Sequence, residues 1–308
     1  MIPLPNISPT DRIMLADWLE LSALSSPSGG ASSGYLESAL NIAGLLDGRG
    51  PEAIQQKALE VFDELEDRAK AAQSGYPFEV KAPSLQLIGD WREHPAYVFC
   101  LCLSYFNHKQ MKGSNDQPRR WFEHLSRDAA KHYIGGDALR FGSPRHQQEV
   151  PKSFKKAIEH VCKKLNEGKG YKSGGLPNRK DDALDIIAWK HFPDGLPGKL
   201  ILFGNCASEK NWENSKKSEL APEPFCVDWM IEPLSCQIVK TLFIPHRIDR
   251  NRFVPLLRRA GIIFDRCRIA YWAYFAGSCA DQIESGRFMT YEPLVKWSED
   301  QLQKKVSA

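Results

Sequence analysis

The sequence of 308 residues predicts a mixed α/β protein with a mainly helical module over residues 1–112 and a second domain over residues 113–308. Three observations predict this fold class. Apolar residues recur at helical spacing through the first hundred residues, short apolar runs typical of strands follow later, and a polar stretch over residues 107–120 separates the two. At this length a chain usually forms two modules or one enlarged domain.

The first module is predicted as helices interrupted by one polar loop. Ser8 or Thr10 can cap a helix over residues 11–24, since either hydroxyl can accept a hydrogen bond from an unpaired amide of the first turn. Residues 25–34 are rich in Ser and Gly, which indicates a loop. A phosphate-binding loop is a poor interpretation, because no Gly-Lys-Ser/Thr follows.

The other elements of this module follow from composition and periodicity. Pro51 suits the first turn of a helix, and residues 96–106 are apolar on all sides, which is typical of a central buried helix. Cys100 and Cys102 within it are interpreted as buried core residues. The expected elements are helices over 35–46, 51–73 and 96–106 and extended segments over 76–80 and 84–91.

In the second domain the order of elements predicts a central mixed sheet flanked by helices. An apolar hairpin over residues 184–206 has its turn at residues 191–198. The other expected elements are helices over 121–134 and 151–168, a basic loop over 169–180, a strand over 236–246, and a strand leading into a helix over 261–275.

Charge and composition exclude some classes of protein. The net charge of +3 is too small to indicate a nucleic-acid binder by itself. The start of the chain has no basic segment followed by an apolar core, and no run of about 18 apolar residues occurs, so neither a signal peptide nor a membrane span is expected. The eight cysteines form no CxxC pair, so we expect reduced thiols, no zinc site and a cytoplasmic protein.

The predicted hairpin carries polar side chains at one end of an apolar surface. Asp185, Ile187 and Trp189 share one face of the first strand, and Ile201, Phe203 and Asn205 share one face of the second. A symmetrical turn would place Asp185 within about one residue of Asn205 across the hairpin. Lys210 follows five residues later, and its flexible stem can return to the same place.

The helix over residues 121–134 contributes a fourth polar group. Its wheel places Glu123 inside the apolar arc, between Ala130 and Ile134, and places Arg127 and Asp128 on the opposite face. A carboxylate on the packed side of a helix is costly unless it meets a cation or a metal ion. We therefore expect Glu123 to point into a site, although a side chain that reaches water at the edge of the face is the common alternative.

These four residues suit metal-assisted hydrolysis of a phosphodiester. Mg²⁺ prefers hard oxygen ligands, which the carboxylates of Glu123 and Asp185 and the amide oxygen of Asn205 supply, with Mn²⁺ as the expected substitute. Lys210 would orient or deprotonate the attacking water and stabilise developing negative charge. The alternative is a strand-end acid with an exposed salt bridge between Asp185 and Lys210.

At these residues the sequence resembles the PD-(D/E)xK, or restriction-endonuclease-like, nuclease superfamily. The stretch "DDALDIIAWKHFPDGLPGKLILFGNCASEKNW" is similar to a pattern of bacterial anti-phage defence nucleases, and the similarity extends over "WFEHLSRDAAKHYIGG", "FGSPR", "LFIPH" and "FDRCRIA". It covers most of residues 119–272. The resemblance implies a restriction-endonuclease-like core in residues 113–308, with a helix acid, a strand acid and an E/Q-x-K on the next strand.

Two positions depart from the superfamily pattern. Asn205 stands where Glu or Gln is usual, which lowers the negative charge offered to a divalent ion, and Ala207 occupies the usual Lys position. Lys210, Lys190 or Glu209 would then complete the site. Asp181 and Asp182 are reserve ligands.

Basic residues near the hairpin are candidates for phosphate contacts. Two structural alternatives explain these basic residues equally well. The lysines and arginines before the hairpin can form a solvated loop, and the later arginines can form ion pairs with neighbouring Asp249 and Asp265. The candidate substrate-binding residues are Lys172, Arg179, Lys180 and Arg266.

The resemblance implies a metal-dependent endonuclease in phage defence, with nucleic acid as substrate and a phage protein as its trigger. DNA is the more usual substrate of the superfamily, and RNA, including transfer RNA, is the alternative. A catalytically inactive relative that binds nucleic acid or protein is a further alternative. The first module would serve regulation, sensing or formation of a homo-oligomer.

Overall fold

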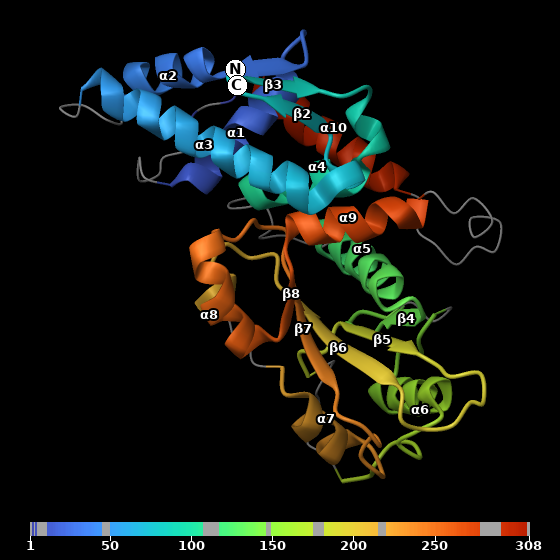
Figure 1. The fold of residues 1–308 in the computed structure, drawn as a ribbon. Helices are drawn as coiled ribbons and strands as arrows, with labels where there is room; N and C mark the ends of the chain where they lie inside the picture. The colour runs from blue at the N-terminus through green and yellow to red at the C-terminus, as the bar shows by residue number, and fades with distance from the viewer. Residues whose placement is uncertain are drawn as a thin grey trace.

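The computed structural model describes residues 2, 4, 11–44, 50–106, 117–145, 149–174, 182–214, 220–277 and 291–306. It is a mixed α/β structure with two sheets (Figure 1). Its α-helices are α1 (Arg12–Ser25), α2 (Ser33–Ile42), α3 (Pro51–Ala72), α4 (Pro95–Phe106), α5 (Gln117–Ile134), α6 (Phe154–Leu165), α7 (Pro222–Trp229), α8 (Arg250–Ala260), α9 (Arg266–Gly277) and α10 (Glu292–Val306). Its strands are β1 (Gly30–Ser32), β2 (Phe78–Lys81), β3 (Ser84–Leu87), β4 (Asp137–Arg140), β5 (Ile186–Lys190), β6 (Leu200–Cys206), β7 (Val239–Phe243) and β8 (Ile262–Phe264).

The larger sheet has five strands in the order β4-β5-β6-β7-β8. Strand β5 is antiparallel to both of its neighbours, β4 and β6, and β6, β7 and β8 are parallel. The predicted central mixed sheet is therefore confirmed. The carboxyl ends of β6, β7 and β8 and the start of β5 lie at the same edge of this sheet.

Helices cover both faces of the five-stranded sheet (Figure 1). On one face Phe122 of α5 packs in a core with Ile186 and Leu202. On the other face Ile158 of α6 and Phe225 of α7 pack in a core with strand residues such as Ile187 and Phe203. Alternate residues of β5 and β6 thus enter opposite cores, as the period of two in the sequence requires.

The first hundred residues form helices around a small sheet with the order β1-β3-β2 (Figure 1). Their core includes Cys267 and Ala270 of α9 and Leu302 of α10, so helices from the end of the chain complete it. α4 packs in two cores, through Val98 on one side and Phe99 on the other. The expected boundary at residue 112 lies outside the described residues, and the division into 1–112 and 113–308 stays a prediction.

Several local predictions are corrected by the structure. The cap of α1 is Asp11, whose carboxylate accepts from the amide of Met14 at 3.1 Å, while Ser8 and Thr10 lie outside the described residues. Strand β1 forms within the predicted loop, because it pairs with β3. Strand β4 and helices α7 and α10 are not among the elements expected from the sequence.

The outer face of α5 is a further correction. Arg127 and Asp128 are buried, with a guanidinium-to-carboxylate distance of 2.7 Å, although the helix wheel places them away from the apolar arc. The reason is tertiary, since Arg127 also pairs with Glu149 at 3.1 Å and Asp128 lies near Tyr291, just before α10. Burial raises the pKa of Asp128, and Arg127 opposes this effect. α5 is thus a central helix with two packed faces.

A buried cluster of charged residues joins the first hundred residues to the five-stranded sheet. Arg68 of α3 lies at its centre, with Asp17 at 2.7 Å, Glu20 at 2.8 Å and Glu64 at 2.9 Å. Arg266, at the start of α9, pairs with Asp17. All five side chains are almost inaccessible to solvent, so each charge depends on its partners.

A second arginine extends this cluster along the edge of the sheet. Arg247, which follows β7, contacts Glu64 at 3.1 Å and Asp265 at 2.6 Å. The hydroxyls of Tyr76 and Tyr97 both donate to Glu20, at 2.7 and 2.8 Å. The loops that follow β7 and β8 are therefore fastened to α1 and α3 by ion pairs.

We predict that Asp17→Asn lowers the free energy of unfolding by about 3–5 kcal/mol, because it leaves Arg68 and Arg266 buried without a shared carboxylate. Urea unfolding of the whole chain measures this loss. The control is Asp63→Asn on the exposed side of α3, which we expect to change stability by less than about 0.5 kcal/mol. Equal effects of the two substitutions would contradict a structural role for the cluster.

The same substitution has a predicted pH dependence. Burial alone would raise the pKa of Asp17, but Arg266 and Arg68 outweigh it and hold the pKa below its ordinary value. The carboxylate therefore contributes stability at pH values above its ordinary pKa of 3.8, and this contribution is lost as the pH falls through the lowered value. Asp17→Asn should flatten the acid side of the curve of stability against pH.

Candidate active site

The hairpin of β5 and β6 brings Asp185 and Asn205 opposite each other. Ile186 pairs with Gly204 and Ile187 with Phe203, so the next pair toward the sheet edge is Asp185 and Asn205. The amide of Asp185 donates to the carbonyl of Gly204 at 2.9 Å, which continues the ladder. The register expected from the sequence is confirmed. The register was predictable from the sequence because a shift by one residue would have turned Ile187 and Phe203 away from their core.

Asp185 is held from two sides, by β6 through its carboxylate and by the residues that follow β4 through its main-chain carbonyl. Its Oδ2 accepts from the amide of Cys206 at 2.8 Å, and its main-chain oxygen accepts from the amides of Phe141 and Gly142 at 2.7 and 3.2 Å. Two residues just before it, Asp182 and Ala183, have φ values of +51° and +64°. Such left-handed conformations are strained for residues other than Gly and cluster at functional sites.

Glu123 of α5 reaches the same place. A Cβ atom placed on Gly142 would lie 2.8 Å from Asp185 Oδ1 and 3.0 Å from Glu123 Oε2. Both carboxylates therefore surround one point beside the Gly142 backbone, and only a residue without a side chain leaves room for them. The structure thus brings together the helix acid and the strand acid named from the sequence.

Arg140 is a site residue that sequence reasoning missed. It is 2% exposed, and its Nε donates to Glu123 Oε2 at 2.6 Å. Its Nη1 donates to the carbonyl of Pro144 at 3.0 Å, while its Nη2 is buried without a hydrogen-bond partner. One guanidinium thus offsets part of the charge of the two acids. The available signal was an arginine just before "FGSPR", in a segment interpreted as a loop.

Asn205 offers a buried oxygen beside Asp185. Its Nδ2 donates to the carbonyl of Ala183 at 2.5 Å, which turns the amide, and its Oδ1 is buried and has no hydrogen-bond partner. A buried acceptor without a donor is rare in proteins and calls for a cation or another donor. Among the buried polar atoms without a partner in the described residues, this oxygen is one that belongs to the residue opposite Asp185.

The donor set fits Mg²⁺. Glu123, Asp185 and Asn205 present carboxylate and amide oxygens, which are the hard ligands that Mg²⁺ prefers, together with water. In the described part of the chain no cluster of three or more His, Cys, Asp or Glu side chains is arranged to hold a metal ion. The metal would thus depend on two acids and one amide, with Arg140 paired to one of the acids.

Lys210 lies in the wall of a different hollow. It is exposed and lines a cavity of about 870 Å³ between α1 and the loops after β6 and β7, together with residues such as Arg12, Asp17, His246 and Arg247. No hydrogen bond or ion pair of its ammonium is found in the described part of the chain. Glu123 and Asp185 are not among the described residues that line this hollow, so the catalytic role of Lys210 stays a prediction.

The alternatives to Lys210 and the reserve ligands have other positions. Lys190 is at the far end of β5, about 16 Å along the strand from Asp185, which makes it a poor candidate. The Oε1 atom of Glu209 lies 3.8 Å from Nη2 of Arg119 in α5. The carboxylate of Asp182 accepts from Trp229 Nε1 at 2.8 Å, and Asp181 lies outside the described residues.

The predicted phosphate-binding residues are only partly described. Lys172 is exposed, and its ammonium donates to the carbonyl of Val227 at 3.0 Å. Arg179 and Lys180 lie outside the described residues. For Arg266 the prediction is wrong, because this side chain is fully buried and paired with Asp17, a residue of α1 that no local sequence pattern could indicate.

Comparison with known proteins gives no match. Neither a family model nor a curated protein nor a solved structure matches the chain in these comparisons. In the part of the chain that the structure describes, none of the helices combines the length and the apolar character needed to cross a bilayer. Function is therefore inferred from the geometry at the edge of the five-stranded sheet.

We predict that Gly142→Ala destabilises the protein by about 1–3 kcal/mol, because the new methyl group would overlap the carboxylates of Asp185 and Glu123. Urea unfolding checks this value. Gly34→Ala in α2 is the matched control, since its Cβ meets only Ser32 Oγ at 4.0 Å. Alanine there should be neutral or stabilise by up to about 1 kcal/mol. A neutral Gly142→Ala would show that the carboxylates do not occupy this place.

Proposed function

We propose that this protein is a metal-dependent nuclease that hydrolyses phosphodiester bonds of nucleic acid. The observation that carries the proposal is the convergence of Asp185 Oδ1 and Glu123 Oε2 beside Gly142, at the start of a hairpin strand. Two acids from a helix and a strand, next to the unsatisfied oxygen of Asn205, form the donor set that Mg²⁺ or Mn²⁺ takes in phosphodiesterases. The restriction-endonuclease-like resemblance of the hairpin sequence supports the same reaction.

Each residue has a distinct task under this proposal. A bound Mg²⁺ supplies Lewis acidity toward a phosphoryl oxygen and lowers the pKa of a water molecule. Asp185, held by the amide of Cys206, and Asn205, held by the carbonyl of Ala183, present their oxygens from two neighbouring strands. Arg140 fixes the orientation of Glu123. Such fixed polar groups stabilise developing charge because they need no reorganisation during the reaction.

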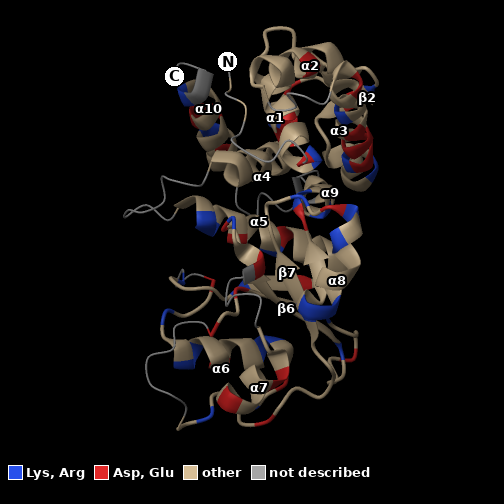
Figure 2. Cartoon of the chain, turned by 90° about the vertical axis from the view of Figure 1, so that its left-hand side faces the viewer, with Lys and Arg blue, Asp and Glu red and all other residues tan. Residues whose placement is uncertain are grey.

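Exposed basic side chains on two helices beside the sheet suit contacts to a phosphate backbone. On α6 they come in two pairs, and on α8 they are arginines that lie along the helix (Figure 2). These residues are Lys155, Lys156, Lys163, Lys164, Arg250, Arg252, Arg258 and Arg259. Contacts to phosphates do not read the base sequence and do not distinguish DNA from RNA. We therefore propose DNA as the substrate on the basis of the resemblance alone, with RNA as the alternative.

The biological setting is also a proposal. The resemblance favours anti-phage defence in the cytoplasm, with a phage protein as the trigger. The ion pairs that fasten α1 and α3 to the loops after β7 and β8 support a regulatory task for the first module, because they connect it to the edge that carries Asp185.

One observation favours a second candidate, a catalytically inactive binder of nucleic acid. Arg140 pairs with Glu123 at 2.6 Å, which offsets part of the negative charge of the two carboxylates, and Asn205, where Glu or Gln is usual in the superfamily, adds none. Low negative charge weakens the binding of divalent ions. Under this candidate the protein binds DNA and no metal-dependent cleavage follows.

We predict that the whole protein cleaves DNA with Mg²⁺ or Mn²⁺ and that Asp185→Ala and Glu123→Gln each reduce the rate at least about 100-fold. Cleavage is measured on duplex DNA, single-stranded DNA and total RNA, with and without the divalent ion. Asp137→Asn at the other end of the sheet, opposite Trp189, is the control and should keep the parental rate. An Asp185→Ala variant as active as the parent would end the assignment. DNA binding without cleavage under any ion would favour the inactive binder.

The role of Lys210 has a separate test. If its ammonium reaches the site in the complex with substrate, Lys210→Met should lower the cleavage rate about 100-fold with little change in stability, because the side chain is exposed. Lys190→Met, at the far end of β5, is the control and should leave the rate unchanged. A Lys210→Met protein that keeps the full rate would remove this lysine from the mechanism.

A further inference from the structure

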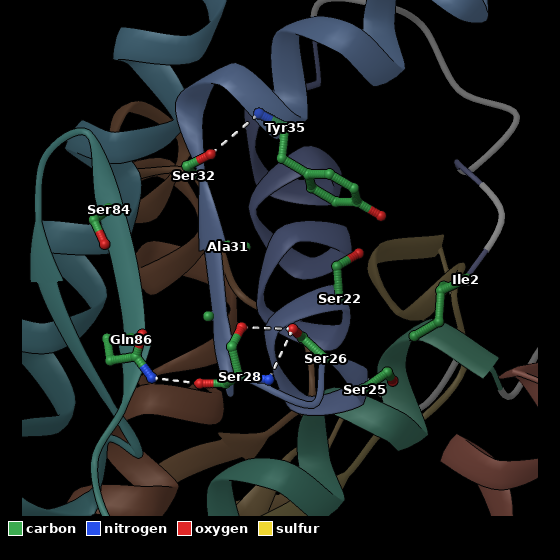
Figure 3. Close-up of a pocket in the computed structure, with 11 residues that line it drawn as sticks. Ile2, Ser22, Ser25, Ser26, Ser28, Ala31, Ser32, Tyr35, Ser84 and Gln86 are labelled. Atoms are coloured by element: carbon green, nitrogen blue, oxygen red, sulfur yellow. Dashed lines mark hydrogen bonds between the residues drawn. The ribbon is translucent and has the colours of Figure 1, made fainter.

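A second hollow, far from the hairpin in sequence, lies between α1, β1 and the start of α2 (Figure 3). Its volume is about 530 Å³, which is within the range of small-molecule sites. The lining is unusually rich in hydroxyl groups, since six serines and Tyr35 contribute to it, together with Gln86. The serines are Ser22, Ser25, Ser26, Ser28, Ser32 and Ser84.

The described lining of this hollow carries no charged side chain. A charged ligand would lose its hydration there without gaining a counter-ion, which is costly. An uncharged ligand with several hydrogen-bonding groups would instead find partners for each of them. The chemistry of the wall thus favours a neutral, polar molecule over a nucleotide phosphate, a metal ion or an acidic peptide.

Hydrogen bonds among the lining residues hold the wall in shape. Ser26 Oγ and Ser28 Oγ lie 2.8 Å apart, and Gln86 Nε2 donates to the carbonyl of Ser28 at 2.8 Å (Figure 3). Ser32 Oγ accepts from the amide of Tyr35 at 3.2 Å and so caps α2. These groups connect β1, β3 and α2. The hollow is therefore a preformed feature of the fold.

Two hydroxyls on α1 have no partner. Ser22 is 8% exposed, and both its Oγ and that of Ser25 are buried without a hydrogen bond. A serine within a helix commonly bonds to the carbonyl four residues earlier, and neither does so. The two lie three residues apart on one face of α1, and the Ser22 hydroxyl points toward the hollow and Tyr35 (Figure 3). Buried polar groups without partners mark a place that a ligand can satisfy.

Strand β1 supplies backbone groups to the same wall. In the described part of the small sheet β1 is an edge strand that pairs only with β3. Gly30 and Ala31 line the hollow, and β1 runs between β3 and the hollow in Figure 3. The opposite edge of a strand carries amides and carbonyls that the sheet does not use. They add donors and acceptors of fixed direction to the serine hydroxyls.

We propose that this hollow binds a small uncharged molecule rich in hydroxyl or amide groups, of the kind represented by nucleosides and simple sugars. Ser22 and Ser25 supply the specific contacts from α1. The site is separate from Glu123 and Asp185, so its existence does not depend on the nuclease proposal.

Isothermal titration of the whole protein with adenosine, uridine and glucose tests the site. At least one probe should bind saturably. Comparing the two nucleosides with glucose shows whether the hollow prefers a nucleoside or a simple sugar. Adenosine 5′-monophosphate should bind at least about tenfold more weakly than adenosine, because no cation meets its phosphate in the described lining. Total tryptophan emission gives a second readout, because one contributor, Trp18, stacks on Tyr35 with ring centroids 5.3 Å apart.

The double variant Ser22→Ala with Ser25→Ala removes the two unpaired hydroxyls with little change in volume and should weaken binding at least about tenfold. The matched control is Ser126→Ala in α5, which also removes a buried hydroxyl without a partner but does not line the hollow, and it should bind as the parent does. The proposal is overturned if none of the three probes binds. It is equally overturned if the double variant binds as tightly as the parent, or if Ser126→Ala weakens binding as much.

Discussion

The ion pairs of Arg68 and Arg266 with Asp17 are the constraint on which the arrangement of the molecule depends. These groups are buried, so removing any one leaves an uncompensated charge at low dielectric. Arg266 follows β8 directly, and the loop after β7 joins the same cluster through Arg247. The carboxyl edge of the parallel strands is therefore held against α1 and α3, and this is the edge at which Asp185 and Asn205 lie.

The same electrostatic rule operates at the candidate active site with a different outcome. In the cluster every carboxylate of Asp17, Glu20 and Glu64 meets an arginine or a tyrosine hydroxyl. At the sheet edge Arg140 donates to Glu123 and to the carbonyl of Pro144, and the Asn205 Oδ1 atom stays without a donor. The cluster also keeps buried atoms without a hydrogen-bond partner, at Glu64 Oε2 and at Nε and Nη1 of Arg266, but each of these groups has an oppositely charged neighbour, whereas Asn205 carries no charge and its oxygen has no donor.

Much of the local fold was predictable because periodicity reports which face is buried. The hairpin register followed from Ile187 and Phe203, and the inward direction of Glu123 followed from the helical period of 3.6. Arg140 escaped because β4 has only four residues, too few for alternation to be visible beside a glycine-rich loop. The buried state of Arg266 depends on Asp17, 249 residues away, and no local pattern carries such information. The same holds for Arg127 and Asp128, whose neighbours Glu149 and Tyr291 lie outside α5.

Helix α1 contacts the serine-rich hollow, the buried ion pairs around Arg68, and the loops after β7 and β8 at the edge of the five-stranded sheet. Ser22 and Ser25 line the serine-rich hollow, and Asp17 joins Arg68 and Arg266 on the same fourteen-residue helix. A straight helix transmits displacement along its axis, whereas a flexible linker absorbs it. A ligand in the hollow that shifted α1 would have to rearrange buried ion pairs whose other members flank the sheet edge. The described contacts thus connect the hollow, through α1 and its ion pairs with Asp249 and Arg266, to the loops that follow β7 and β8.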